Sequence, residues 1–407
     1  MRLQKGFVLL PFLILIFVIL IVFGASYWRG NKTSDSSEYT PQEKKTESSK
    51  IVYAKEIDSI DDSGNRRYPI YSVIQSNLDG SDKKEIFRVG DVNNYPRDFK
   101  LVKERNIVLV NMEHSLLAYN LETGERKELY QGARGQNYIF GFAVSHDGGR
   151  VAINISNDLY NTPVGYSLKE GQDTVVIMII DLDDNKQEVI LSKNIKEVGS
   201  LGWLTPEFWS SDDQKIYMRD SYPSEYIGYL WQINVDGLNL KVLSVSPGNH
   251  TPDGRYLAYM NIDSHRDVKW ECGLGGGESG ELRIFDTKIN KDILVDKDTL
   301  GEKTINSYGW ASDNRRLVYG NRKYLSGEEC EATFAPEEFY GYDIVTQKTT
   351  RLTDISEVEK LTKPSPYIEA KFLSDPENPG GSYELKVDGR TIDVSDYGMS
   401  IMYIGQP

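Results

Sequence analysis

Residues 209–218 read WSSDDQKIYM, and residues 231–243 read WQINVDGLNLKVL. Each stretch joins a short polar turn, rich in Asp or Gly, to a run of mainly apolar residues. Asp and Gly favour turn conformations, and two such runs on either side of Asp-Gly are typical of a β-hairpin. These two stretches therefore predict two kinds of turn within one antiparallel unit.

Both turns recur along the chain. In each copy of the first turn, the residue four positions after the turn Asp is apolar and begins a short strand. The copies of the first turn are Ser145–Gly148, Ser211–Asp213, Thr251–Gly254 and Ser312–Asn314. The second turn recurs at positions 79, 122, 183, 236, 286 and 343, at intervals of 43, 61, 53, 50 and 57 residues. Four-stranded propeller blades repeat at about 40–50 residues, so the sequence predicts an all-β propeller of antiparallel blades with inserted loops.

These repeats also resemble those of a known family. Residues 76–84 (SNLDGSDKK) and 209–212 (WSSD) are similar to the repeats of TolB-type propellers, which carry a W-S-P-D-G turn and then a D-A-D-G-S hairpin. The likeness covers most of residues 51–370. It implies a WD40-like propeller and, by analogy, protein–protein contact in the cell envelope. The Trp-Asp pair that closes each blade of true WD repeats is absent.

The expected number of blades is six to seven. Six repeats are visible, and residues 367–394 are a candidate for an irregular seventh. Residues 51–89 supply three strands and lack an opening one. We expect a C-terminal strand at residues 399–404 to pair there, because an open ring would leave two strand edges unpaired.

The first 29 residues predict a membrane anchor. Residues 7–24 contain no charged side chain, and the apolar stretch continues to Trp28, which gives 22 positions. About 20 apolar residues span a bilayer as a helix, and Tyr27 and Trp28 lie where interfacial aromatic residues gather. A short N-terminal tail normally stays inside, so the rest of the chain is expected on the extracytoplasmic side of the cell membrane.

Two alternatives concern the same segment. A cleaved signal peptide would use the small residues at 24–26, but its apolar region is normally shorter. Residues 5–10 resemble the processing site of type IV prepilins, although Pro11 stands where those proteins usually carry Glu. Residues 30–50 are rich in Ser, Thr, Glu and Lys, which predicts a disordered tether before the propeller of residues 51–407.

Composition limits the partners and the chemistry. Lys and Arg number 47 against 61 Asp and Glu, a net charge of −14, which argues against nucleic acid as the main partner. No G-x-S-x-G, H-E-x-x-H or C-x-x-C motif occurs. The Gly-rich residues 273–280 lack the strand, helix and Lys of a phosphate loop. We therefore predict no catalytic, cofactor or metal residue.

Cys272 and Cys330 are predicted to form a disulfide. They lie 19 and 17 residues after the turn Asp of their repeats, and so occupy the same insertion of adjacent blades. Outside the cytoplasm such a pair would oxidise, and two free thiols are the alternative.

Aromatic residues in the insertions are the candidate binding residues. They are Trp270, Tyr222, Tyr226, Tyr324 and Phe334. Aromatic side chains on loops suit contact with a protein or glycan, and packing of the loops on themselves is the alternative. The expected function is a non-catalytic binding or scaffold module for an envelope protein or glycan. The alternatives are a polysaccharide hydrolase or lyase with carboxylates in the central channel, and a pilin-like surface subunit.

Overall fold

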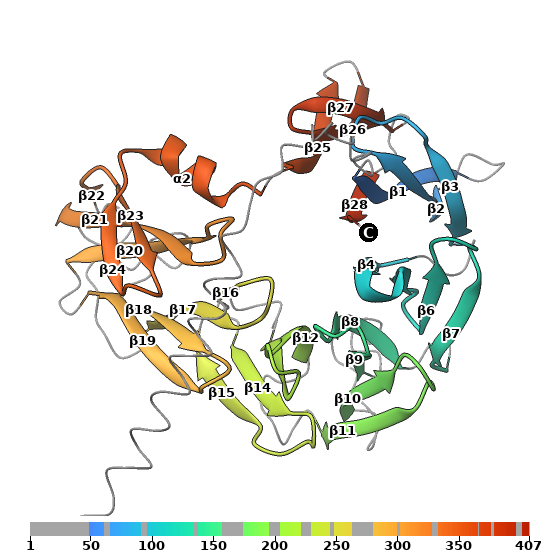
Figure 1. Cartoon of the computed structure of the whole chain (residues 1–407), viewed down its shortest axis with the longest axis horizontal. Coiled ribbons are helices and arrows are strands. Elements are labelled where there is room, and N and C mark those ends of the chain that lie inside the picture. The colour runs from blue at the N-terminus through green and yellow to red at the C-terminus, as the bar shows by residue number, and fades with distance from the viewer. Residues whose placement is uncertain are drawn as a thin grey trace, which may run out of the picture. The chain divides into compact units, whose positions relative to one another are not determined.

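The structure is a computed structural model of the chain. It describes residues 49–60, 66–90, 96–133, 137–156, 174–194, 204–220, 229–244, 248–262, 280–298, 302–327, 333–364, 366–375, 378–395 and 401–406. Residues Ser48–Pro407 form one compact unit, in which seven antiparallel sheets follow one another (Figure 1). The predicted all-β architecture is confirmed, and the number of sheets is seven.

The first three sheets have four strands each. Sheet 1 has the order β28 (Ile401–Gly405), β1 (Lys50–Ile60), β2 (Arg66–Asn77) and β3 (Lys84–Val89). Sheet 2 consists of β4 (Asp98–Val102), β5 (Ile107–Asn111), β6 (Ser115–Asn120) and β7 (Arg126–Gln131), with a 3-10 turn, η1 (Lys103–Arg105), after β4. Sheet 3 consists of β8 (Tyr138–Val144), β9 (Arg150–Ser156), β10 (Thr174–Asp181) and β11 (Gln187–Asn194).

The other four sheets differ more among themselves. Sheet 4 consists of β12 (Leu204–Trp209), β13 (Lys215–Asp220), β14 (Leu230–Asn234) and β15 (Lys241–Ser244). Sheet 5 consists of β16 (Asn249–His250), β17 (Tyr256–Ile262), β18 (Gly280–Asp286) and β19 (Lys291–Lys297). Sheet 6 has the order β20 (Lys303–Trp310), β21 (Arg316–Ser326), β23 (Glu338–Asp343) and β24 (Lys348–Arg351), and β22 (Thr333–Phe334) pairs with β21. Sheet 7 has three strands, β25 (Ile368–Asp375), β26 (Asn378–Val387) and β27 (Arg390–Val394).

Sheet 1 joins the two ends of the compact unit. Its first strand, β28, comes from the C-terminal end of the chain and pairs with β1, where Val52 lies opposite Gly405 and Ala54 opposite Met402. The predicted closing strand is therefore confirmed. Sheet 7 corresponds to the predicted irregular seventh repeat.

The first turn is closed by a hydroxyl group. Ser145 Oγ donates to Asp147 Oδ1 at 2.6 Å and accepts from the backbone N–H of Arg150 at 2.9 Å. The same pair of bonds is made by Ser210 in sheet 4 and Thr251 in sheet 5. The repeated Ser or Thr and Asp therefore fix the geometry between the first and second strands of a sheet.

In sheets 2 and 4, the second turn needs glycine because it packs on the preceding sheet. Gly124 has φ +72°, and a Cβ there would lie 2.8 Å from the carbonyl oxygen of Ile86 on β3. Gly237 has φ +78° and approaches the carbonyl of Ile190 on β11 in the same way. The hairpin between the third and fourth strands thus also contacts the outermost strand of its neighbour.

Apolar clusters lie between neighbouring sheets. Sheets 1 and 2, 2 and 3, 3 and 4, 4 and 5, 5 and 6, and 7 and 1 share such clusters. The other face of sheet 6 packs on α2 (Ile355–Thr362), where Val318 and Leu352 contact Val358. Helix α2 therefore covers the face of sheet 6 that is turned away from sheet 5.

The membrane anchor cannot be placed in this fold. Among the described residues, no helix has the length and apolar character needed to cross a membrane. The predicted anchor at residues 7–28 and almost all of the tether at residues 30–50 lie outside the described residues. Both stay predictions.

Two repeated tryptophans hold neighbouring sheets together. Trp209 is fully buried, and its Nε1 donates to the carbonyl of Ala143 on β8 at 2.9 Å. Trp310 in sheet 6 donates to the carbonyl of Asn249 on β16 at 2.8 Å. Each indole therefore fills a core and satisfies a carbonyl of the preceding sheet.

Replacing Trp209 with Phe should lower the free energy of unfolding by about 1–3 kcal/mol beyond the packing loss, because the Ala143 carbonyl is left without its partner. Urea unfolding at pH 7 measures the effect. Trp231→Phe is the matched control, because its Nε1 is buried without a hydrogen-bond partner. An equal loss in both variants would show that the Trp209 hydrogen bond contributes nothing.

The contact between sheets 7 and 1 should depend on pH. Burial alone would raise the pKa of Asp393, but the Tyr53 hydroxyl at 2.6 Å and the ammonium groups of Lys55 and Lys83, both at 3.3 Å, lower it below its ordinary value. This carboxylate stabilises the fold above the pKa of the unfolded chain, and the stabilisation is lost as the pH falls through the lower folded pKa.

Asp393→Asn should therefore cost about 1–3 kcal/mol of unfolding free energy at pH 7, and the difference from the native chain should shrink below about pH 3. Urea unfolding at both pH values measures it. The exposed Glu128→Gln should leave stability unchanged. A loss for Asp393→Asn that is the same at both pH values would contradict the proposed ionic contribution.

Candidate functional site

The two short turns lie at the same end of every four-stranded sheet. The backbone shows this directly, because the start of the second strand bonds to the hairpin that follows the third strand. In sheet 1 the N–H of Leu78 donates to the carbonyl of Ser49 at 3.1 Å. The equivalent bonds are Leu121 to Asn106, Leu182 to Gly149, Val235 to Gln214, Thr287 to Arg255, Ile344 to Arg315 and, in sheet 7, Asp388 to Tyr367. We call this end of each sheet the turn end and the opposite end the loop end.

Neighbouring turn ends are bonded to one another. The backbone N–H of His146 in sheet 3 donates to Asp213 Oδ1 in sheet 4 at 2.9 Å, and its ring Nδ1 lies 3.0 Å from the same oxygen. Arg105 in sheet 2 bonds to the carbonyl of Gly148 and to Asp183 in sheet 3. The turn ends of these sheets therefore share one face of the ring, and the described chain begins on that face at Ser49.

The long connections leave from the loop ends. Strand β9 ends at Ser156 and β10 begins at Thr174, and β17 ends at Ile262 before β18 begins at Gly280. Such second-to-third strand connections contain Tyr222, Tyr226, Trp270, Cys272 and Cys330, which all lie outside the described residues. The binding role of these aromatic residues and the disulfide stay predictions.

Tyr324 and Phe334 are the two predicted binding residues that the structure describes. They lie on β21 and β22, and their rings meet edge to face with centroids 6.1 Å apart. The Tyr324 hydroxyl donates to the carbonyl of Gly327. Both side chains are half-buried. The two rings therefore pack on each other. Such packing was the alternative to a binding role, and that role stays a prediction.

A polar cavity lies beside the first strands of sheets 4, 5 and 6. It has a volume of about 740 Å³, and its lining includes polar side chains of six kinds and one indole. Its principal lining residues are Glu207, Arg219, Asn249, His250, Trp310 and Asn314. Arg219 Nη2 lies 2.7 Å from Glu207 Oε1. The cavity thus contains an ion pair, amide groups and an imidazole.

The charges around this cavity are coupled. One face of the His250 ring stacks on Phe208, with centroids 4.1 Å apart. His250 keeps part of its surface open to solvent. Desolvation of its ring by the surrounding protein lowers its pKa, and the carboxylate of Glu207 opposes that shift. On β4, burial lowers the pKa of Lys100, while the Asp98 and Glu207 carboxylates oppose that shift. Burial thus disfavours the charged forms of both side chains, and the nearby carboxylates favour them.

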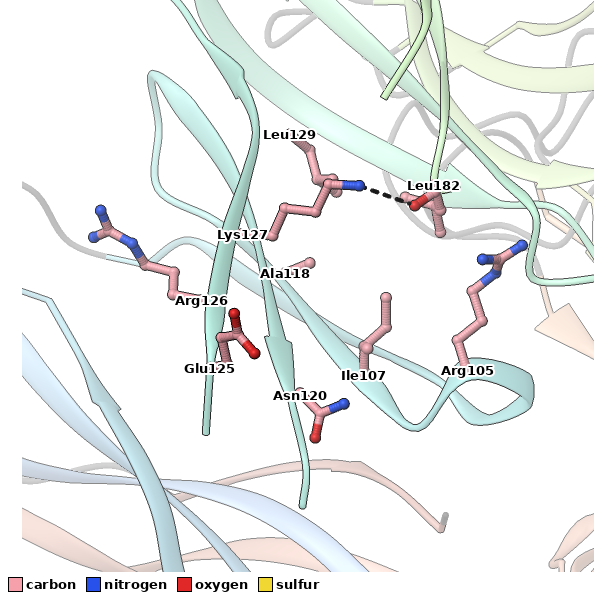
Figure 2. A pocket seen from close by; sticks show the side chains of 9 residues that line it. All are labelled: Arg105, Ile107, Ala118, Asn120, Glu125, Arg126, Lys127, Leu129 and Leu182. Atoms are coloured by element: carbon pink, nitrogen blue, oxygen red, sulfur yellow. Dashed lines mark hydrogen bonds between the residues drawn. The ribbon is translucent and has the colours of Figure 1, made fainter. Parts of the chain in front are cut away.

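A second cavity, of about 430 Å³, lies between sheets 2 and 3 at their turn ends (Figure 2). Its floor is apolar, and cationic side chains stand at its rim. Lys127 Nζ donates across it to the carbonyl of Leu182 at 3.2 Å, and Arg105 is paired with Asp183. Figure 2 shows the guanidinium of Arg126 directed away from the floor. Because these rim cations are occupied or turned away, we assign this cavity no ligand.

The polar cavity was not predicted from the sequence. Its residues come from strands far apart in the chain, and no spacing links them. The only signal was general, namely that carboxylates from several blades can meet in a central channel. Glu207 fits that expectation, whereas Lys100, Arg219 and His250 had no signal of their own.

Comparison with known proteins finds likeness of fold and does not identify a function. No protein-family model matches the sequence, and no curated protein is similar to it. Solved structures that are similar include an oligogalacturonate lyase in complex with manganese, with 13% identity, TM-score 0.46 and coverage of 83% of either chain. An oligogalacturonate lyase from Vibrio parahaemolyticus has 14% identity and TM-score 0.43 and covers 88% of this chain and 91% of its own.

A TolB protein is also similar to this chain. TolB from Acinetobacter baumannii has 12% identity and TM-score 0.33, with coverage of 88% of this chain and 80% of its own. The predicted TolB-like β-propeller agrees with the seven successive antiparallel sheets of the described residues. Identities this low concern the fold alone.

The charges near His250 predict the direction in which its pKa changes in two variants. His250 should titrate below its ordinary pKa. Glu207→Gln should lower that pKa further, because a carboxylate that raises it is removed, and Lys100→Gln should raise it, because a cation that lowers it is removed. The ring protons of the four histidines, followed by NMR against pH, measure these shifts. Unchanged titration in both variants would show that these charges do not face His250.

Proposed function

We propose that the chain is a membrane-anchored β-propeller on the extracytoplasmic side, which binds an envelope protein or glycan without catalysing a reaction. One observation carries the proposal. The described part of the chain begins at the turn end of sheet 1, whereas the long second-to-third strand connections leave from the loop ends. In this proposal, the side that is attached to the membrane and the side that carries the binding loops are separated by the length of the strands.

The expected anchor gives this separation a direction. If residues 7–28 span the membrane, the tether of residues 30–50 joins it to the face on which the turn ends lie. A flexible chain of that length has an r.m.s. span of about 25 Å. The loop ends then point away from the bilayer, where Trp270, Tyr222 and Tyr226 are available to a partner. Long loops carried on a rigid scaffold are common binding sites.

The cavity beside Glu207 and His250 favours a second candidate, a polysaccharide hydrolase or lyase. Its carboxylate, Glu207, and its imidazole, His250, belong to the residue types that such reactions use. Turnover of envelope glycans by the full chain, lost in Glu207→Gln, supports this candidate. The pilin-like alternative requires cleavage after Gly6, which the mass of the mature N-terminus decides.

The binding role is tested with the full chain in detergent, immobilised and exposed to envelope extract. We expect a reproducible protein or glycan to be retained, and to be lost when residues 265–279, which precede β18, are deleted or Trp270 is changed to Ala. Leu238→Ala is the matched control, because Leu238 is an exposed apolar residue at a turn end. It should leave retention unchanged.

Two outcomes contradict the proposal. Loss of retention in Leu238→Ala but not in the deletion would place binding at the turn ends. No retention by a folded chain would count against a stable binding role and favour the enzyme.

A further inference from the structure

Sheet 7 lacks the inner strand that the other six sheets have. Its outermost strand is identified by contact with sheet 1, since Gly80 in the hairpin of sheet 1 packs on Ile392 of β27. Elsewhere this hairpin glycine packs on a fourth strand, as Gly124 does on Ile86 of β3. Strand β27 therefore takes the fourth position of its sheet.

The other end of the sheet gives the same assignment. The bond from the N–H of Asp388 to the carbonyl of Tyr367, at 2.7 Å, is the one that joins the second strand to the hairpin in every other sheet. Strand β25 is thus a second strand, and no strand of the described residues fills the first position beside it. Helix α2 and its linker take the place in the chain where that first strand would come.

The hydrogen bonds of sheet 7 show which backbone groups of β25 face the open position. The Tyr367–Asp388 bond directs the Tyr367 carbonyl toward β26, and the N–H of Ser395 donates to the carbonyl of Tyr383, at 2.8 Å, so the backbone of Tyr383 faces β27. Tyr383 lies opposite Phe372 in a register that is unbroken from Ile368 to Leu373. Because backbone direction alternates along a strand, the N–H and C=O groups of Ile368, Ala370 and Phe372 point away from β26.

Exposure supports the same conclusion. The central residues of other second strands, such as Leu109, Ile153 and Tyr217, are fully buried. On β25, Phe372 is 48% and Leu373 is 36% exposed, and Ala370 is exposed as well. Among the described residues, no strand pairs with this edge. Proteins commonly protect a free edge with charge or proline. Strand β25 carries Glu369 and Lys371, whereas Ile368, Ala370 and Phe372, whose backbone faces the open position, are apolar.

We propose that an extended segment of a partner protein fills this position and completes sheet 7 by adding as its inner strand. Main-chain hydrogen bonds to Ile368, Ala370 and Phe372 give affinity in such β-strand addition. Five of the six inner strands of the other sheets, β4, β8, β12, β20 and β28, have five to eight residues, which indicates the required length, whereas β16 has two.

The two faces of β25 define the side chains of the partner strand. Ile368 packs with Tyr53 and Leu385 in the cluster between sheets 7 and 1, so the partner's residues on that side are apolar. Glu369 and Lys371 alternate with these residues and lie on the opposite face, which favours polar residues there. The partner segment is therefore amphipathic with a period of two. This site is separate from the loop-end aromatic residues, and it does not depend on them.

The test is hydrogen–deuterium exchange on the full chain, with five synthetic peptides that copy β4, β8, β12, β20 and β28 as probes. Without peptide, the amides of Ala370 and Phe372 should exchange about 100-fold faster than those of Val318 and Gly320 in β21, which has a neighbour on both sides. At least one peptide should protect β25, and its version with alternate backbone amides methylated should not.

Two variants at one position make the test specific. Ala370→Pro removes the N–H that faces the open position and leaves the pairing with β26 intact, so peptide protection should be lost. Ala370→Val keeps the N–H and should keep protection. A thermal melt shows that both variants fold, and deletion of residues 265–279, which precede β18, should leave the peptide effect unchanged.

Three results would overturn the proposal. If β25 is as protected as β21 in the free chain, the edge is already covered, and a dimeric mass in native mass spectrometry would identify a second copy as the cover. If none of the five peptides protects β25, the edge does not accept a strand. If a peptide protects Ala370→Pro as well as the native chain, binding does not use this edge.

Discussion

Each first strand has one edge without a neighbouring strand, and its carbonyl groups need other partners. Side chains of adjacent sheets supply them. Asn111 Nδ2 donates to the carbonyl of Ile139 on β8 at 3.0 Å, Asn154 donates to that of Leu204 on β12, and Lys100 donates to that of Phe142. Trp209 and Trp310 act in the same way. Because a buried carbonyl without a partner is costly, these bonds both stabilise the inner strands and fix one sheet against the next.

The parts of the fold that could be predicted from sequence are those with local causes. The hydroxyl and Asp of the first turn, and the glycine of the second, lie within a few residues of the strands that they connect. Their recurrence was therefore visible in the sequence, and the closing strand followed from the need to pair an open edge. The partners of Asn111 and Trp209 lie 28 and 66 residues away. Such contacts leave no pattern in a single sequence.

The candidate sites also divide into features with local causes and features that depend on distant contacts. Aromatic residues in insertions can be found by eye, but their roles depend on packing, and Tyr324 and Phe334 turn out to contact each other. The cavity beside Glu207 and His250 combines residues from three sheets, so no sequence motif could predict it. The missing strand of sheet 7 was partly visible, since residues 367–394 read as irregular. The contacts of Gly80 and Asp388 were needed to identify which of its strands is missing.

The pairing of β1 with β28 also determines when this protein can finish folding. Val52 and Gly405 lie in the same sheet, so sheet 1 is incomplete until residues 401–405 have left the ribosome. Until then, β1 offers an unpaired edge for as long as the other sheets take to emerge. Free edges promote association with other chains, so a chain that stops before Ile401 would keep this liability.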